Sequence, residues 1–230
     1  MDPNSIKTLS GIAGAQGKQI SMKDLFSVDV FRGSDSGVTI TNGIDLAGEG
    51  GMVWIKKLAG SHMYVSDTVQ GVGNVMELDT DAGSSGNSVY GVTQFNSDGF
   101  STKGDDDKMH IAVTFRQHPR FFQMATYNGN GNSGKEIEHG LEGAPGMVIY
   151  KQRSGSNDWF VYHTNMHGQS KKDRWYLKME SSAESGEDQD IYDDKVPSNT
   201  KLFVGDNMLK MIWLFLIVFL LWIFYKTWGE

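Results

Sequence analysis

Clusters of acidic residues are the first candidates for chemistry in this sequence. Asp105 to Asp107 and Asp98 fall in one short stretch, and Asp79 and Asp81 precede it. Carboxylates of this kind suit Ca²⁺, which binds ~6–8 oxygen ligands. The stretch lacks the spacing of an EF-hand loop and has no glycine at a loop centre. We therefore interpret these aspartates as solvated turn residues, and the sequence predicts no metal site.

The histidines form no metal-binding motif either. His163 and His167 are four residues apart, a spacing that places two side chains on one face only in a helix. Residues 164–166 and the β pattern around them argue against a helix, and no HExxH motif occurs. The chain has no cysteine, which excludes thiolate zinc sites and cysteine nucleophiles. We predict no metal and no other cofactor.

Motifs for nucleophilic catalysis and phosphate binding are also missing from the sequence. No serine lies in the GxSxG elbow of acyl-transfer enzymes. Residues 129–131 (GNG) resemble a phosphate loop but lack the Lys-Ser/Thr pair that contacts phosphate and Mg²⁺. Carboxylate pairs for glycoside hydrolysis are defined by distance in space, so sequence spacing singles out none. We predict a protein that is not an enzyme and has no catalytic residue.

Aromatic residues remain as candidates for contact with a ligand. Trp54 and Trp159 stand in corresponding strands of an internal repeat, and we interpret both as core residues. Trp175 and Tyr176 have no clear counterpart in the repeat. We therefore predict that Trp175 and Tyr176 are ligand-binding residues that face outward, where a sugar ring could stack on them.

The charge distribution narrows the class of partner. Lys and Arg total 21 and Asp and Glu total 28, which gives a formal net charge of −7. This balance argues against a nucleic-acid binder. The acidic residues 184–194 follow a basic cluster at residues 171–174. We interpret the acidic segment as a mobile surface loop, and a charge contact between neighbouring subunits is the alternative.

The elements that position these residues are predicted to be short β-strands. Apolar runs indicate strands at residues 52–55, 63–65, 111–115 and 121–127. Turns rich in Gly, Asp, Asn and Ser separate these runs, and no convincing helical period occurs before residue 205. Glycine accounts for 28 of the 230 residues. Short strands joined by glycine turns are typical of a sandwich or barrel.

An internal repeat organises the chain. Three glycines of the first half recur in the second half at nearly constant offsets of 96, 97 and 95 residues: Gly33, Gly43 and Gly51 match Gly129, Gly140 and Gly146. A two-residue deletion near residues 44–46 accounts for the change in offset, and Gly99-Phe100 loosely matches Leu202-Phe203. Glycines and apolar positions recur while polar positions vary, which indicates a repeated scaffold.

The repeat and the strand pattern together predict the organisation of the chain. The expected fold is all-β, with two tandem jelly-roll or lectin-like sandwich units of ~95 residues. The predicted boundaries are an N-terminal arm at 1–25, β unit 1 at 26–126, β unit 2 at 127–207 and an apolar tail at 208–230. The arm is interpreted either as a docking arm or as a frayed terminus. No signal-peptide core follows the N-terminus.

The apolar run from Met211 to Tyr225 has three interpretations. A membrane anchor is the first, since Trp213 and Trp222 would sit near the ends of the run as interfacial aromatics do. A helix of this length would measure ~22 Å against a hydrocarbon core of ~30 Å. A buried pair of final strands is the second interpretation. The third is a frameshifted tail on a truncated unit, because the run leaves the pattern of the repeat.

A family resemblance adds to this interpretation. The segments TITNGIDLAGEGGMVWIKK (39–57), FNSDGF (95–100) and YNGNG (127–131) stand in the same order as in a repeated β domain. In the second unit the YNGNG opening precedes a His139-Gly140-Leu141 turn, a Pro145-Gly146-Met147-Val148 strand entry and a strand with Trp159. The chain resembles the repeated β-sandwich domain family of tailed, especially marine, bacteriophage structural proteins over about residues 26–207.

The resemblance implies a function without supplying catalytic residues. It implies a structural component of a phage virion, tail- or capsid-associated, that assembles with other virion proteins and with copies of itself. The expected location is the virion, with the host cytoplasm during assembly. The alternative function is a carbohydrate-binding module for a host surface glycan, because jelly-roll folds host many functions. A polysaccharide-degrading enzyme would need two carboxylates ~5–10 Å apart in a cleft.

Overall fold

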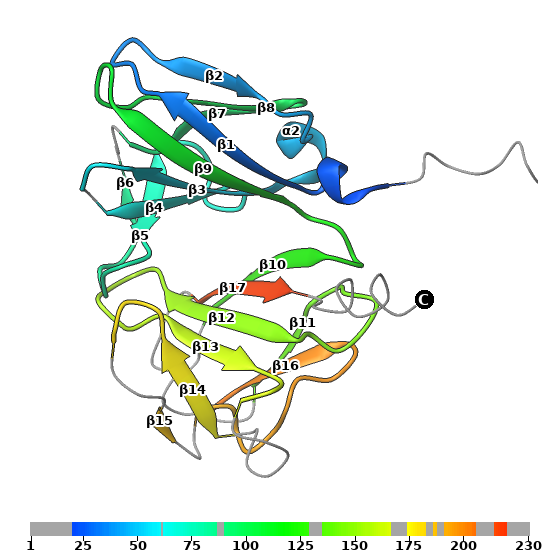
Figure 1. Ribbon diagram of the computed structural model, residues 1–230. Coiled ribbons are helices and arrows are strands. Elements are labelled where there is room, and N and C mark those ends of the chain that lie inside the picture. Colours follow the sequence, from blue (N-terminus) through cyan, green and yellow to red (C-terminus); the bar gives the residue numbers. More distant parts are fainter. Residues whose placement is uncertain are drawn as a thin grey trace, which may run out of the picture.

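The protein folds almost entirely as antiparallel β-sheet (Figure 1). The computed structural model describes residues 20–60, 62–86, 90–128, 135–166, 174–182, 186–187 and 191–205, together with the backbone of residues 214–219. Every pairing between two strands in this part of the chain is antiparallel. The predicted all-β fold is confirmed.

The elements fall into two successive sets. The first half of the chain contains η1 (Met22–Asp24), β1 (Phe26–Arg32), β2 (Val38–Thr41), α2 (Leu46–Glu49), β3 (Gly51–Lys57), β4 (Met63–Asp67), β5 (Asn74–Glu77), β6 (Ser85–Gly86), β7 (Val92–Asn96), β8 (Gly99–Thr102) and β9 (Met109–Arg116). The second half contains β10 (Phe122–Tyr127), β11 (Lys135–Glu138), β12 (Met147–Gln152), β13 (Phe160–His163), β14 (Trp175–Lys178), β15 (Gly186–Glu187), β16 (Lys201–Val204) and β17 (Leu214–Phe219).

Each half has one large and one small sheet. The large sheet of the first half has the order β1-β9-β3-β4-β5-β6, and its small sheet has the order β2-β8-β7. The large sheet of the second half has the order β10-β17-β12-β13-β14-β15, and its small sheet pairs β11 with β16. The four predicted strand regions lie in β3, β4, β9 and β10, so these predictions are confirmed.

The strand registers of the two halves correspond. Met52 of β3 pairs with Asp67, and Met147 of β12 pairs with His163, which are the partners expected from the offsets of the repeat. The match of Gly99-Phe100 to Leu202-Phe203 is wrong by one residue. Ile40 pairs with Phe100 in the first half, and Ile137 pairs with Leu202 in the second, so Phe100 corresponds to Leu202.

Three hydrophobic clusters define the layers of the molecule. One cluster lies between the sheets of the first half and includes Ile40, Val53 and Phe100. A second lies between the sheets of the second half and includes Ile137, Tyr150 and Leu202. The third joins the two halves, since it contains residues of β3, β4, β5 and β9 together with residues of β10, β12 and β13. The two large sheets therefore pack against each other in the middle of the molecule (Figure 1).

This layering explains the continuous apolar runs of the sequence. Met52 and Val53 are both fully buried, although neighbouring residues of a strand point to opposite faces. Met52 belongs to the central cluster and Val53 to the cluster of the first half. A sheet covered on both faces needs apolar residues at successive positions, so its strands do not show the alternation of a half-exposed sheet.

The described part of the C-terminal apolar run is a strand. β17 lies between β10 and β12 and pairs with both along its whole length. This is the backbone conformation that the buried-strand interpretation predicts for Leu214–Phe219, while the rest of the run lies outside the described residues. Among the described residues, the structure contains no helix with the length and apolar character needed to cross a membrane.

The acidic segment at residues 184–194 differs from the expected surface loop. Ile191 and Tyr192 are about 1% exposed and belong to the hydrophobic cluster of the second half. Tyr192 contacts the rings of Tyr150 and Tyr162 at centroid distances of 5.6 and 5.5 Å. The described end of the segment is thus anchored in the core, because its two large apolar side chains outweigh the acidic residues around them.

Candidate functional site

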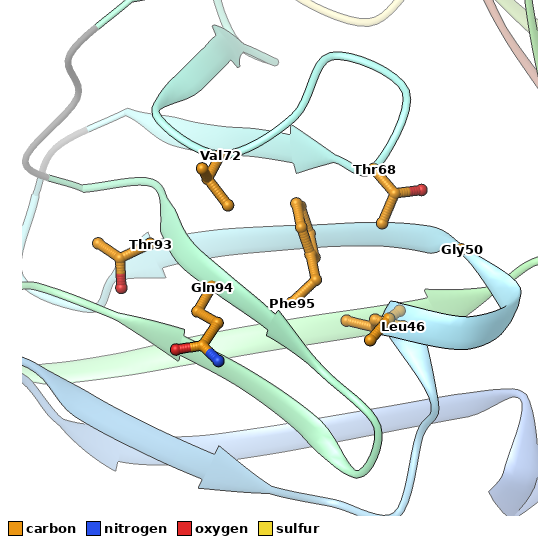
Figure 2. A pocket seen from close by; sticks show the side chains of 8 residues that line it. Leu46, Gly50, Thr68, Val72, Thr93, Gln94 and Phe95 are labelled. Atoms are coloured by element: carbon orange, nitrogen blue, oxygen red, sulfur yellow. The ribbon is translucent and has the colours of Figure 1, made fainter.

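A groove of about 580 Å³ on the first half is the candidate site. Its walls come from α2, from the loop that follows β4, and from β7 (Figure 2). We call it the α2–β7 groove, and it is lined by Leu46, Ala47, Gly50, Thr68, Val72, Thr93, Gln94 and Phe95. These elements are far apart in the sequence, so sheet topology brings the lining residues together.

A β-bulge in β7 sets the direction of one wall. Val92 pairs with Thr102 and Gln94 with Ser101, which leaves Thr93 as an extra residue. In a regular strand, residues 92 and 95 would point to opposite faces. Because of the bulge, Val92 and Phe95 pack on the same hydrophobic cluster, while Thr93 and Gln94 are exposed. Figure 2 shows the Phe95 ring standing in the groove among the other lining side chains.

The opposite wall is held by a buried carboxylate. Asp67 is fully buried and accepts hydrogen bonds from the backbone N–H groups of Val69 (2.9 Å) and Gln70 (2.8 Å). Burial raises the pKa of Asp67, and the hydrogen bonds from Gln70 act in the opposite direction. The Gln70 side chain accepts from Ser84 Oγ at 2.7 Å, and its backbone carbonyl accepts from Asn74 Nδ2 at 2.8 Å. These contacts fix the loop that carries Thr68 and Val72.

The third wall is the end of α2. Asp45 caps the helix by accepting from the Gly48 N–H at 2.7 Å. Gly50 ends the helix with a φ of 76°, a left-handed conformation that favours glycine. Its Cα also lies close to neighbours, since a Cβ there would come within 2.6 Å of Gln117 Nε2. The Thr68 hydroxyl accepts from the Gly51 N–H at 3.0 Å, which joins this wall to the loop after β4.

The chemistry of the groove is neutral and mixed. Its lining includes the apolar side chains of Leu46, Val72 and Phe95, and no lining residue is charged. The side chains of Thr68, Thr93 and Gln94 can each donate and accept hydrogen bonds. The groove thus offers an apolar surface beside groups that suit either hydrogen-bonding role.

Sequence reasoning missed this groove. The signal that could have found it was the two-residue gap in the repeat near residues 44–46, because α2 begins at Leu46. In the second half, residues 139–146 between β11 and β12 contain no helix. The described residues of that half also include no strand in the place of β7. Within the described residues, the elements that form the groove therefore occur in the first half alone.

The predicted ligand-binding residues lie elsewhere. Trp175 and Tyr176 are consecutive residues of β14, so their side chains point to opposite faces of the sheet. Tyr176 packs edge-on against Phe160 at a ring distance of 5.1 Å and lies against the hydrophobic cluster of the second half. Trp175 pairs with Glu187 of β15. Both side chains are partly exposed, and their role in ligand binding stays a prediction.

The acidic turn residues have separate partners. Asp105 forms an ion pair with Lys57 at 2.5 Å, and the hydrogen bond to Lys57 lowers the pKa of the Asp105 carboxyl. Asp106 accepts from the backbone N–H of Asp35 at 2.8 Å. Asp107 has a left-handed φ of 57°, and its carbonyl accepts from Arg32. The carboxylates of Asp105 and Asp106 and the carbonyl of Asp107 thus each contact a different residue.

The histidines are also separated. His139 is buried, its Nε2 lies 3.1 Å from the Ser198 carbonyl, and burial lowers its pKa. His163 Nδ1 accepts from the Asn165 N–H, while His167 lies outside the described residues. Across the described part of the chain, no three His, Asp or Glu side chains gather closely enough to hold a metal.

A polar contact locks the two halves together beside the central cluster. Lys151 is fully buried, and its ammonium donates to the carbonyls of Asp81 (2.7 Å) and Asn157 (2.5 Å). The indole N–H of Trp159 donates to the carbonyls of Glu77 and Thr80 at 2.9 and 3.1 Å. Burial lowers the pKa of Lys151 to about 8. Both side chains belong to the second half, and they reach the first half through the carbonyls of Asp81, Glu77 and Thr80, while Asn157 is a partner within the second half.

Comparison with known proteins gives one family match. A family model described as a domain of unknown function (DUF7483) matches residues 117–212. The matched residues include β10 to β16, which lie in the second half of the chain. The comparisons with curated proteins and with solved structures gave no match. The family description names no activity, so function must be argued from the geometry.

Proposed function

We propose that the protein is a non-enzymatic structural component of a phage virion, tail- or capsid-associated, built from two copies of one jelly-roll or lectin-like unit. It would assemble with other virion proteins and with copies of itself, in the virion and in the host cytoplasm during assembly. The resemblance of residues 39–57, 95–100 and 127–131 to phage structural domains supports this proposal. The corresponding strand order of the two halves supports the duplicated unit.

The exposed edge of β1 is the observation that carries the assembly role. β1 is the outermost strand of its sheet, and within the described residues only β9 pairs with it. Val28 and Val30 are 52% and 59% exposed on this seven-residue strand. Natural proteins usually protect such an edge with charges, proline or a covering element, because it can template pairing with another chain. β1 also carries Asp29 and Arg32, so the exposed apolar part of this edge is the stretch with Val28 and Val30, which is suited to receive a strand.

The corresponding edge strand of the second half, β10, exposes fewer large apolar side chains. In β10, the register counterpart of Val28 is Met124, which is buried, and the counterpart of Val30 is Thr126. The edge strand of the first half thus exposes more apolar side-chain surface than that of the second half. We infer that a β1 strand from a second copy pairs with it and extends the large sheet across the contact.

Replacement of both valines by lysine tests this role. In V28K/V30K, two charges on the edge should prevent strand pairing without removing core contacts. We expect sedimentation velocity to show concentration-dependent association of the wild type and a monomeric double variant with an unchanged circular dichroism spectrum. Val196→Lys, at another exposed valine, is the matched control and should associate like the wild type. A wild-type protein that stays monomeric at high micromolar concentration would refute self-assembly through β1.

A further inference from the structure

We propose that the α2–β7 groove binds an uncharged carbohydrate. This inference goes beyond the structural role and does not depend on the β1 edge. It also places the glycan site in the first half, away from Trp175 and Tyr176 on β14.

The absence of charge in the groove selects a neutral ligand. The chain carries a formal net charge of −7, yet all eight lining residues are uncharged. A site for a phosphate, a carboxylate or an acidic sugar would be expected to provide Arg, Lys or a helix terminus with free N–H groups. A site for a cation would provide carboxylates. The lining contains neither Arg or Lys nor a carboxylate, so the groove suits a ligand that is polar without being charged.

The arrangement of polar and apolar groups selects a sugar among neutral ligands. A pyranose ring has C–H faces that pack on aromatic and aliphatic side chains, and a rim of hydroxyl groups that both donate and accept. Val72, which is exposed, and Phe95, which is half-buried, offer the apolar contact. Thr93 and Gln94 lie beside them with exposed side chains that can donate and accept. Few well-placed polar groups on an apolar wall are typical of small-molecule sites.

The walls are held in place before any ligand binds. The Thr68 hydroxyl already accepts from the Gly51 N–H, which leaves its own proton available for a ligand oxygen. The Val92 N–H donates to Ser66 Oγ at 3.1 Å, so β7 is tied to β4 at the bulge. Rigid walls reduce the entropy that binding costs, which matters for an open site with few contacts.

The groove is confined to the half that carries the extra elements. Both halves share strand order and register, while α2 and β7 stand in the first half only, within the part of the chain that the structure describes. A scaffold needs neither element, since the second half closes its two sheets around a core without them. In the first half, α2 and β7 add Leu46 and Val92 to the core, while Thr93 and Gln94 remain exposed in the groove.

The proposal is tested with the full chain and a panel of neutral trisaccharides. Maltotriose, cellotriose and chitotriose are each titrated up to about 10 mM, since shallow sites bind weakly. Saturation-transfer NMR reports contact, and chemical-shift changes give the affinity. Gln94→Ala removes an exposed amide without touching the core and should weaken binding about threefold to tenfold. Phe95→Ala should abolish detectable binding, with circular dichroism as the check on folding.

Two further variants locate the site. Thr93→Trp places a large side chain in the groove from an exposed position and should block binding in a folded protein. Trp175→Ala is the matched control and should bind like the wild type. Saturation transfer from at least one neutral trisaccharide that is lost in Thr93→Trp supports the proposal. Absence of binding by all three sugars, or binding that survives Thr93→Trp, overturns it, and loss in Trp175→Ala alone would place the site on β14.

Discussion

Lys151 predicts an unusual dependence of stability on pH. Its side chain is fully buried where the two halves meet, and its ammonium donates to two backbone carbonyls. Glu180, Asp81 and Asp158 lie near enough to raise the pKa of Lys151, but burial outweighs them and lowers it to about 8. The unfolded chain should keep the ordinary lysine pKa of about 10.5.

The sign of the effect follows from proton binding. Between about pH 8 and pH 10.5, the unfolded state keeps the proton that the folded state has released. Stability therefore rises with pH in this window, and it is lost as pH falls through the folded pKa. Integration from pH 7 to pH 9.5 gives an increase of about 2 kcal/mol in the free energy of unfolding from this group alone. The neutral amine can still donate to both carbonyls, so the contact persists.

Two substitutions isolate this contribution from other titrating groups. Lys151→Met is never charged, and Lys151→Arg is charged at every pH of the window. Neither side chain titrates there, so the stability of the wild type relative to each variant should rise by the same amount, about 2 kcal/mol, between pH 7 and pH 9.5. The measurement is urea denaturation followed by tryptophan fluorescence at half-unit pH intervals. Equal unfolding slopes would show that the transitions are comparable.

The outcome that refutes the reasoning is a flat difference. If wild type and Lys151→Met keep a constant stability difference over the window, the Lys151 side chain titrates as it does in water. The ammonium would then be solvated, and the two halves would not exclude water from Lys151. The stability of the wild type could also rise with pH relative to Lys151→Met but not relative to Lys151→Arg. That result would point to altered packing in one variant instead of titration.

Two further predictions concern the core. Tyr192→Phe should raise the free energy of unfolding by about 1 kcal/mol, because its buried hydroxyl has no hydrogen-bond partner among the residues that the structure describes and its desolvation is uncompensated. Trp159→Phe is the control that should destabilise, since it removes a donor with two partners. Gly99→Ala should cost about 2 kcal/mol or more in thermal denaturation, because a Cβ there overlaps the Ile40 carbonyl. Gly86→Ala, where a Cβ has room, should change stability little, and an equal loss in both would contradict the steric argument.

The strand framework was predictable from local signals. Apolar runs at residues 52–55 and 111–115 are long enough to mark strands covered on both faces. The match of Gly43 to Gly140 was also visible in the sequence. Both residues have a positive φ, of 79° and 67°, which glycine adopts without a steric penalty, so both positions favour glycine. These signals depend on a residue and its near neighbours, so the sequence alone could reveal them.

The groove and the buried end of the acidic segment depend on distant contacts. The direction of Phe95 follows from a bulge that is defined by its pairing with β8, and no local pattern announces it. Tyr192 lies among acidic residues in the sequence, yet it packs on Tyr150, more than forty positions away. The charge content of the segment predicted a surface loop and gave no sign that Ile191 and Tyr192 are buried.

The meeting of the two large sheets has a consequence for symmetry. The central cluster holds matching positions from both halves, such as Val65 with Val161 and Leu25 with Phe121. Contact through equivalent surfaces is the isologous arrangement of a two-fold dimer, here formed within one chain, and such a contact is self-limiting. Because each half buries its matching face against the other, these faces are not open to a further partner. Matching positions need not hold the same residue, since Met63 and Trp159 pack on the same cluster.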